Sequence, residues 1–437
     1  METKLERISE LAENDSELKF TSLAHLLNEE NLKKCYRELG KNKAPGVDGE
    51  TWDEYGKALD ENIKNLVERL KVKSYWPKPV KRTYIPKEGK DEERPIGIPA
   101  LEDKIVQLGI SKILTAIYEA DFLEISYGFR PERSPHDALR ELNKSIMVRE
   151  TNWILDADIK GFFDHVDHEW MIRCLKERIR DTTLLKLIGR FLKAGIVEEG
   201  KYSETNVGTP QGGNLSPVLS NIYLHYVLDL WVKYVLRRKL KGYVKLIRFA
   251  DDFVICFQAR KEAKQSFKLL KERLAKFGLE LSEEKTCLVE FGRHADNPGT
   301  FDFLGITHSC SQNVKGGFMV GHSTSAKKFR SKIKELREWL KLVSRKYKPS
   351  DWWDKLRSKL LGHFRYYGVS GNYHRIREYK RVAKEILFKW LNRRSQKRSY
   401  SWDEFDIYLK RHPLPKPKVY HDLFKAPANS ECDWRAG

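Results

Sequence analysis

Aspartates lie near the end of one apolar segment and in the middle of another, and this pattern constrains the fold more than any other feature. Residues 151–159 read TNWILDADI, and residues 243–259 read YVKLIRFADDFVICFQA. In the second segment Asp251 and Asp252 separate two apolar runs, which predicts a β-hairpin. Helical patterns surround both segments, over 102–120, 168–195, 217–240 and 260–277. Strands interleaved with helices predict an α+β sheet domain that ends near residues 310–320.

The aspartates lie beside apolar strands, where burial makes an ionised carboxylate unfavourable. Asp158 ends one apolar strand, and Asp251 and Asp252 lie at the tip of the hairpin. If the strand ends meet in one sheet, like-charge repulsion between the three carboxylates is relieved by divalent metal ions. Oxygen ligands favour Mg²⁺ or Mn²⁺, and two such ions serve phosphoryl transfer. The alternative is an ordinary Asp-Asp turn and a strand-end cap.

Almost all of the positive charge lies in one part of the chain. The 437 residues carry a formal net charge of +20, from 82 Lys and Arg against 62 Asp and Glu. Residues 321–420 hold 28 of the basic and 9 of the acidic residues, together with 17 aromatic residues. Cations that neutralise phosphates and rings that stack on bases favour nucleic-acid binding by this segment. An ordinary basic helical domain with an aromatic core is the alternative.

Three amphipathic helices are predicted inside the basic segment, over 324–346, 351–368 and 373–394, and they should form a small bundle. Upstream, residues 1–43 are expected to be helical, 52–72 to form one amphipathic helix, and 135–150 another. Residues 301–309 are expected to be one short strand, and the last forty residues an irregular tail.

The composition also indicates a cellular setting. No stretch approaches about 18 consecutive apolar residues, and the N-terminus METKLERISELAENDSE is polar and acidic. The six cysteines are scattered, without the paired spacing of zinc sites. We expect a cytoplasmic protein that neither crosses a membrane nor carries a secretory signal.

Five motifs occur together in a known order. They are LDADIKGFFDHVDH (155–168), GTPQGGNLSP (208–217), RFADDFVI (248–255), GLELSEEKT (278–286) and FDFLGI (301–306). Their order and spacing resemble those of group II intron-encoded reverse transcriptases and maturases. The segments LLGHFRYYGVSGNYHRI (360–376) and KWLNRRSQKRSY (389–400) are similar to the C-terminal region of the same proteins.

The resemblance implies an α+β right-hand polymerase, in which fingers and a palm with an antiparallel sheet precede an α-helical thumb or maturase bundle. The implied divisions are an N-terminal helical extension (1–43), the fingers and palm (44–315), the thumb or maturase region (316–400) and a basic C-terminal tail (401–437).

The resemblance also assigns the catalytic residues. Asp158, Asp251 and Asp252 match metal-binding catalytic carboxylates, with two Mg²⁺ ions expected, Mn²⁺ as a possible substitute, and the backbone carbonyl of Ile159 as a further ligand. Lys285 matches a lysine that protonates the leaving pyrophosphate. An exposed lysine without a catalytic role is the alternative for Lys285.

Four residues match nucleotide-binding positions. Phe163 matches a bulky residue beneath the incoming sugar, where it would exclude a 2′-hydroxyl. Gln211 lies in a glycine-flanked loop that approaches the nucleotide. Lys87 and Arg94 match residues that grasp the triphosphate. The alternative for Phe163 is a core phenylalanine, and the alternative for the loop of Gln211 is a simple tight turn. Lys87 and Arg94 could instead be two solvated cations.

Four more residues match the template–primer contacts of the family. Arg130 resembles a position near the template, and Phe303, Leu304 and Gly305 resemble a primer-grip hairpin. The chain departs from the family by having Phe249 where many members have tyrosine. It also lacks the paired cysteines of a His-Asn-His endonuclease domain, so target-strand cleavage is not expected.

The resemblance predicts an RNA-directed DNA polymerase that extends a DNA or RNA primer on an RNA template with dNTPs, and that also binds group II intron RNA as a splicing maturase for intron mobility. One alternative is a freestanding relative in DNA repair or phage defence. Others are a protein that is chiefly an RNA-binding splicing cofactor, and a structural nucleic-acid-binding protein without activity. The oligomeric state is not predicted.

Overall fold

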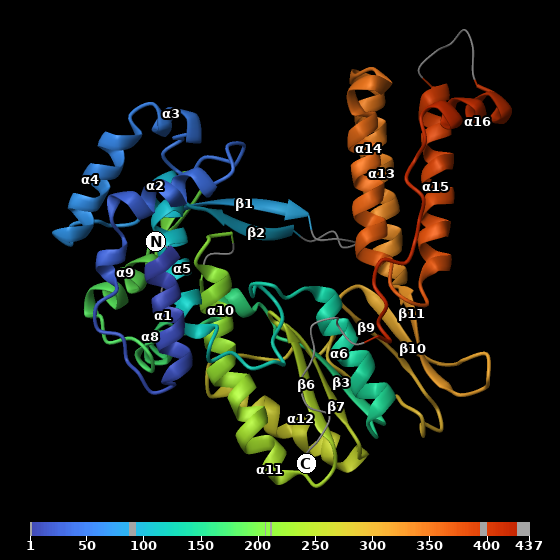
Figure 1. The fold of residues 1–437 in the computed structure, drawn as a ribbon, viewed down its shortest axis with the longest axis horizontal. Coiled ribbons are helices and arrows are strands. Elements are labelled where there is room, and N and C mark those ends of the chain that lie inside the picture. The colour runs from blue at the N-terminus through green and yellow to red at the C-terminus, as the bar shows by residue number, and fades with distance from the viewer. Residues whose placement is uncertain (1, 87–92, 206, 210–211, 394–399, 426–437) are drawn as a thin grey trace.

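The computed structural model describes residues 2–86, 93–205, 207–209, 212–393 and 400–425. Figure 1 shows a U-shaped arrangement, with one group of helices and a β-hairpin on the left, a sheet region below, and long helices on the right. The observed mixture of antiparallel sheets and helices confirms the predicted α+β class, with fingers and palm followed by a helical thumb. We use these three names for the left, lower and right parts.

The palm is built on a four-stranded antiparallel sheet of order β6-β7-β3-β8. Its strands are β3 (Trp153–Asp158), β6 (Val244–Phe249), β7 (Asp252–Phe257) and β8 (Cys287–Glu290). The predicted hairpin is therefore confirmed, with Phe249 opposite Asp252 and a two-residue turn between them. Ala250 in that turn has a φ of 57°, a left-handed conformation that is strained for a residue with a Cβ atom.

Helices cover both faces of the palm sheet. Because side chains alternate along a strand, one face packs on α10 (Ser216–Leu224) and α12 (Arg260–Ala275), and the other on α6 (Pro135–Val148). After α10 the helix continues through π-helical turns at His225–Asp229 and Val232–Leu236 to α11 (Arg237–Lys239). The long helix predicted for 217–240 is therefore present, with two π-turns within it.

The fingers join helices to a second four-stranded sheet of order β2-β1-β4-β5. Its strands are β1 (Val80–Pro86), β2 (Glu93–Ile98), β4 (Ile196–Glu198) and β5 (Lys201–Ser203). The helices of this region are α1 (Glu2–Asn14), α2 (Glu29–Glu38), α3 (Trp52–Gly56), α4 (Leu59–Lys71), α5 (Leu101–Tyr118), α8 (His168–Lys176) and α9 (Thr182–Leu192).

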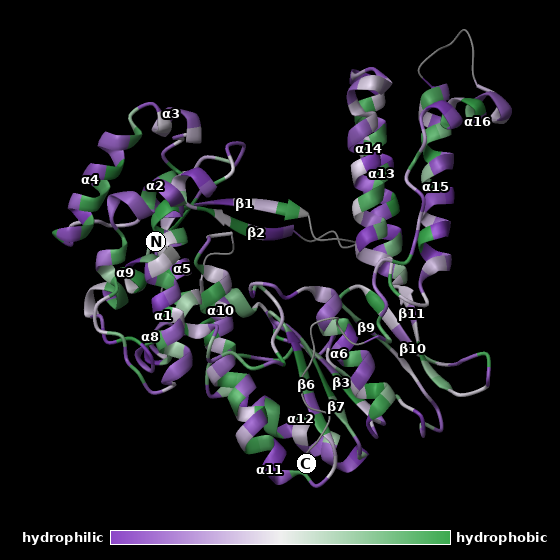
Figure 2. Ribbon diagram, viewed as in Figure 1, coloured by the Kyte–Doolittle hydropathy of each residue, from purple (hydrophilic) through white to green (hydrophobic). Residues whose placement is uncertain are grey.

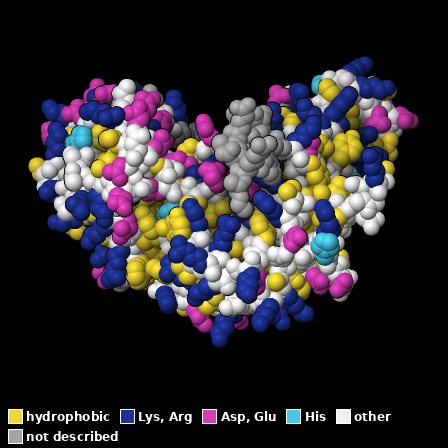
Figure 3. All heavy atoms as spheres, turned by 60° about the horizontal axis from the view of Figure 1, so that its bottom comes forward, with side chains coloured by type: hydrophobic (Ala, Val, Ile, Leu, Met, Phe, Trp, Pro, Cys, Tyr) yellow, Lys and Arg dark blue, Asp and Glu magenta, His cyan; other side chains and the backbone are white. Residues whose placement is uncertain are grey.

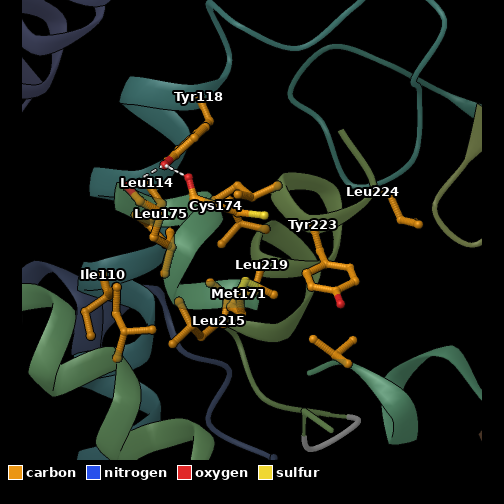
Figure 4. Close-up of a cluster of buried hydrophobic side chains, with 14 of the residues drawn as sticks. Ile110, Leu114, Tyr118, Met171, Cys174, Leu175, Leu215, Leu219, Tyr223 and Leu224 are labelled. Atoms are coloured by element: carbon orange, nitrogen blue, oxygen red, sulfur yellow. Dashed lines mark hydrogen bonds between the residues drawn. The ribbon is translucent and has the colours of Figure 1, made fainter. Parts of the chain in front are cut away.

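A buried cluster joins the fingers to the palm. Figure 4 shows side chains of α5, α8 and α10 packed together. Within it the Tyr118 hydroxyl donates a hydrogen bond to the Leu175 carbonyl at 3.0 Å. This buried hydroxyl therefore has a hydrogen-bond partner within the protein.

The thumb follows a three-stranded antiparallel sheet of β9 (Thr300–Phe303), β10 (Ile306–Gln312) and β11 (Phe318–Thr324). Its helices are α13 (Ala326–Lys346), α14 (Pro349–Tyr367), α15 (Tyr373–Asn392) and α16 (Trp402–Arg411). Figure 2 shows hydrophobic and hydrophilic residues mixed along α13, α14 and α15, as expected for a bundle. The three predicted helices are confirmed, and most of their aromatic side chains are buried in the bundle.

A C-terminal strap, residues 418–423, returns from the thumb to the palm. The backbone amide of Tyr420 donates to the Gly368 carbonyl at 2.7 Å. The Asn143 side chain on α6 donates to the Leu423 carbonyl at 3.0 Å, and the rings of His136 and His421 stack at 3.5 Å. The strap therefore ties the end of α14 to α6.

Two helices predicted as continuous are each broken in two. The 52–72 helix is divided into α3 and α4 at Ala58, whose φ of −124° and ψ of 40° lie outside the helical region. The 168–195 helix ends at Lys176 and restarts after Asp181. Asp181 accepts hydrogen bonds from the first amides of α9 with one carboxylate oxygen and from Leu23 and Ala24 with the other.

Two further expectations were wrong. The single strand predicted for 301–309 is a hairpin of β9 and β10, because Leu304 and Gly305 both take positive φ angles in a tight turn. The tail predicted to be irregular contains α16, whose start is fixed by a capping box between Ser401 and Glu404.

Candidate functional site

The three predicted aspartates lie together at one end of the palm sheet. Asp158 is the last residue of β3, and it lies directly opposite Asp252, the first residue of β7. Asp251 occupies the turn before β7. The strands therefore place the three predicted carboxylates at one sheet edge.

The alternation of side chains orients this group. Leu155 and Phe253 belong to the core beneath the sheet, whereas Ile154 and Val254 belong to the core on the other face. Asp156, Asp158 and Asp252 share the face of Ile154 and Val254, which is the face toward the thumb. Asp156 is a fourth carboxylate that the sequence reasoning missed, although its place two residues before Asp158 was a sufficient signal.

Burial and mutual repulsion raise the pKa values of Asp156, Asp251 and Asp252. Burial, followed by the charges of Asp156, Asp251 and Asp158, raises the pKa of Asp252 to about 8. The pKa of Asp251 is also raised, mainly by burial. Burial and the neighbouring charge of Asp302 raise the pKa of Asp156 to about 7. These three carboxyl groups therefore ionise less readily than a free aspartic acid, and positive charge nearby would favour their ionised forms.

Lys285 supplies part of that charge. Its Nζ atom lies 2.6 Å from Asp158 Oδ2, and about half of the lysine side chain is exposed. The predicted catalytic lysine therefore reaches the predicted catalytic carboxylate from the loop before β8.

The donor atoms at this edge fit Mg²⁺ better than zinc, because all are oxygens. Within the described ranges no three His, Cys, Asp or Glu residues are arranged as a ready group of metal ligands, and Asp158 is paired with Lys285. The Ile159 side chain has no donor atom, so only the backbone carbonyl of this residue could be a ligand. Metal binding by Asp158, Ile159, Asp251 and Asp252 therefore stays a prediction.

The glycine-rich loop predicted to approach the nucleotide packs beside Phe163. The Thr209 amide donates to the Phe163 carbonyl at 2.7 Å, and the Gly208 amide to the Val166 carbonyl at 2.8 Å. A Cβ atom at Gly208 would come within 2.9 Å of two backbone oxygens, so only glycine permits this approach. Phe163 itself is half-buried against the fingers–palm core. Gln211 lies outside the described residues.

A cleft of about 730 Å³ runs from Asp252 to the thumb. Arg94 on β2, Asp252, and the turn residues Leu304 and Gly305 line its palm side, whereas Phe303 is fully buried beneath the turn. Lys87, the other predicted triphosphate contact, is outside the described part of the chain. Thumb residues complete the lining, among them Lys328, Lys332, Lys359, Gly362 and Tyr366.

The cleft has Asp252 and Arg94 on one wall and, on the thumb wall, three lysines with one acidic residue, Glu335. Figure 3 shows the molecule hollowed between its two arms, with many Lys and Arg side chains on the right-hand arm. The Tyr366 hydroxyl on α14 donates to the Leu304 carbonyl at 3.0 Å, which fixes the predicted primer-grip turn against the thumb. Gly362, one turn earlier, faces open space.

Arg130 lies away from this cleft lining. Its guanidinium binds the Glu119 carboxylate at 2.6 Å and the carbonyls of Leu123 and Ser126, and its side chain is 3% exposed. In this structure Arg130 therefore holds the loop of residues 126–131 together, and a contact with the template stays a prediction.

The structure adds a buried brace behind the catalytic turn. Arg248 and Asp229 are both fully buried and form two hydrogen bonds, at 2.6 and 2.8 Å. Arg248 also donates to Asn221 Oδ1 and to the Ala250 carbonyl, each at 3.0 Å. The brace holds the residue before Asp251 in place. An arginine within an apolar strand was the only signal in the sequence.

Comparison with known proteins agrees with this geometry. Residues 85–308 match the family described as reverse transcriptase (RNA-dependent DNA polymerase). The chain is 34% identical to the group II intron-encoded protein LtrA of Lactococcus lactis subsp. cremoris over 358 residues, covering 68% of this chain and 58% of the relative. It is also 34% identical to protein YkfC of Escherichia coli over 245 residues, covering 50% of this chain and 64% of the relative.

An uncharacterized 91 kDa protein in the cob intron of Schizosaccharomyces pombe is 36% identical over 203 residues, covering 46% of this chain and 24% of the relative. The chain therefore spans less than two thirds of the length of each of these relatives. No helix among the described residues is long and apolar enough to cross a membrane.

Proposed function

We propose that this chain, which belongs to the reverse transcriptase family and is similar to group II intron-encoded members, is an RNA-directed DNA polymerase that extends a primer with dNTPs. The observation that carries the proposal is the acidic sheet edge of Asp158, Asp251 and Asp252, because Asp252 lines a cleft whose thumb wall carries three lysines. A template-directed polymerase needs acidic groups where the chemistry takes place and cations along the path of the nucleic acid, and this arrangement supports both.

The residues at the sheet edge have distinct proposed tasks. Asp158 and Asp251 would hold Mg²⁺ with help from Asp252 and the Ile159 carbonyl, and bound Mg²⁺ supplies charge stabilisation for an in-line attack at the α-phosphate. Lys285, 2.6 Å from Asp158, carries a proton toward the leaving pyrophosphate.

The nucleotide and duplex contacts follow the cleft. Arg94 lines the cleft beside Asp252 and is proposed to bind the triphosphate as a fork, with Lys87 and Gln211 completing that contact. Phe163 is proposed to exclude rNTPs. Lys328, Lys332 and Lys359 are proposed to contact the backbone of the template–primer duplex, which is recognised by its shape.

Primer extension tests the polymerase proposal. We expect purified protein with Mg²⁺, dNTPs and an annealed RNA template and DNA primer to make cDNA. Asp251→Asn should reduce the rate at least a hundredfold, because removing one key charge-stabilising group costs on the order of 10²–10³ in rate. The exposed Asp296 is the matched control, and Asp296→Asn should extend like the parent. Equal rates for Asp251→Asn and the parent would refute the proposal.

A second candidate function is binding of group II intron RNA as a splicing maturase. The name of the Lactococcus relative, an intron-encoded protein, and the basic thumb segment support it. An intron RNA encoded around the gene should splice faster with the protein, and Asp251→Asn should retain that effect. If no such RNA surrounds the gene, a freestanding role in DNA repair or phage defence is favoured.

A further inference from the structure

A second basic groove lies on the fingers, apart from the cleft described above. It has a volume of about 720 Å³ and runs between α8, α9 and the segment around Trp76 that leads into β1. In Figure 1 α8 and α9 lie at the left of the molecule, whereas the thumb helices that line the template–primer cleft lie at the right. Nothing in the proposed polymerase reaction uses this groove.

The lining of the groove is strongly cationic. Its charged residues are Arg173, Lys176, Lys186, Arg190, Lys193 and a single acid, Glu169. Glu169 is 3.8 Å from Arg173, so it offsets only one of the five cations. Lys176, Lys186 and Lys193 are exposed, and the described residues offer them no ion-pair partner. This excess of positive charge favours binding of a polyanion over binding of a typical protein surface.

An aromatic ring stands at the edge of the groove. Trp76 is 67% exposed, which is unusual for tryptophan in a folded chain. The Arg190 guanidinium covers one face of the indole ring, 4.5 Å from its centroid, and is itself held by hydrogen bonds to the Lys73 and Tyr75 carbonyls. A ring braced on one side and exposed to solvent is suited to stack on an unpaired base.

The floor of the groove is open. Gly189 lies in the interior of α9, where glycine costs about 1 kcal/mol of stability relative to alanine. A Cβ atom built at Gly189 meets no atom within 4 Å, so packing does not require glycine there. Buried Leu185 and Leu192 form apolar surface on either side of it along the helix. The missing side chain therefore leaves room for a ligand to lie against the helix.

We propose that this groove binds a single-stranded RNA segment, separately from the template–primer cleft, with its phosphates on Lys176, Lys186 and Lys193 and a base against Trp76. A single strand fits because duplex RNA would have no unpaired base for the indole ring. The site goes beyond the polymerase function, since it works without any step at the aspartates.

The test separates the two sites by filling the cleft first. The protein is saturated with a blunt RNA–DNA hybrid duplex, and a fluorescent single-stranded RNA of twelve A and C nucleotides is added. Fluorescence anisotropy then measures RNA affinity between 50 and 300 mM KCl. We expect the parent protein to bind the RNA with a clear salt dependence.

Three groove variants should each weaken this binding. The triple variant Lys176→Gln, Lys186→Gln, Lys193→Gln should reduce the magnitude of the log–log salt slope by about 2, from about 0.7 for each lost phosphate contact to a single strand. Trp76→Ala should weaken binding about tenfold, as expected for one stacked base. Gly189→Leu should block the groove while leaving the helix intact.

A matched triple variant on α12 is the control. Lys261, Lys264 and Lys268 are also exposed and lie outside both sites, so their replacement by Gln should leave the salt slope unchanged. If the groove variant and the α12 variant behave alike, or if Trp76→Ala binds as well as the parent, the proposal is overturned and the groove does not bind RNA.

Two further readouts keep this test independent of the polymerase proposal. Photo-crosslinking with 4-thiouridine RNA should label peptides from residues 170–193 in the parent and not in Gly189→Leu. Primer extension on a short template should be unchanged in all groove variants. Failure of extension in the parent would refute the polymerase function and leave the groove result standing, whereas crosslinks only at the thumb would refute the groove site.

Discussion

Replacing Arg248 should destabilise the palm more than any other single change at a charged residue near the site. Arg248→Met keeps most of the side-chain volume and removes the guanidinium. The Asp229 carboxylate is then left fully buried without its partner, and breaking a buried ion pair in this way costs about 3–5 kcal/mol. Urea unfolding, followed by tryptophan fluorescence and circular dichroism, measures this loss in the free energy of unfolding.

The double variant Arg248→Met, Asp229→Leu separates the effect of the unpaired Asp229 charge from the effect of the other lost hydrogen bonds. It removes the unpaired carboxylate, so most of the lost stability should return. A residual loss of about 1–3 kcal/mol should remain, because Asn221 Oδ1 and the Ala250 carbonyl have lost their donor. Its primer extension should stay below that of the parent, since the residue before Asp251 is no longer held.

The exposed Arg238 provides the control, and Arg238→Met should change the free energy of unfolding by less than about 0.5 kcal/mol. A loss below about 1.5 kcal/mol in Arg248→Met would show that the brace is not a stabilising unit of the fold. A double variant no more stable than the single one would show that the buried charge of Asp229 is not the cause of the loss.

Four other changes have definite expected outcomes. Gly362→Ala should stabilise α14 by up to about 1 kcal/mol in thermal unfolding, yet weaken template–primer binding several-fold in a filter assay, because its methyl group projects into the cleft; unchanged affinity would contradict this. Phe163→Ala should admit rNTPs in single-nucleotide incorporation, and an unchanged rNTP-to-dNTP ratio would disprove its role in sugar selection. Lys285→Ala should slow single-turnover incorporation at least tenfold, with partial rescue by Lys285→Arg, whereas a rate equal to that of the parent would remove Lys285 from the mechanism. Burial raises the pKa of Asp103 to about 7, compared with about 3.9 in the unfolded chain, so the stability that Asp103 contributes is full below about pH 4 and is lost as the pH rises through 7. Asp103→Asn should therefore reduce the difference in melting temperature between pH 4.5 and pH 8. An unreduced difference would refute this assignment.

The sequence predicted the elements whose pattern is local. The β6–β7 hairpin follows from two apolar runs around Asp251 and Asp252, and the three thumb helices follow from apolar residues at helical spacing. The β9–β10 turn was missed because Leu304 gives no sign that it will take a φ of 52°. By contrast, α16 did have a signal, the Ser401 to Glu404 capping box, which its proline-containing surroundings obscured.

The acidic residues of the candidate site could be predicted from the sequence, but the residues that hold them in place could not. Asp158 and Asp252 could be paired because Asp158 is the last residue of one apolar strand and Asp252 the first of another, and the resemblance to a family indicated Lys285 as a further residue of the site. The Arg248–Asp229 brace joins a strand to a π-helical turn, and no periodicity within either segment shows that the other is its partner. The groove beside α8 and α9 was likewise hidden, because its cations come from separate segments.

The C-terminal strap bears on how the cleft admits a duplex. Hydrogen bonds from the strap to Gly368 and Asn143, with the stacked rings of His136 and His421, join thumb and palm on the side away from the fingers. A thumb that is attached to the palm both at its base and through the strap should not rotate relative to the palm. We therefore expect the palm and the thumb to keep their relative positions when substrate enters the cleft.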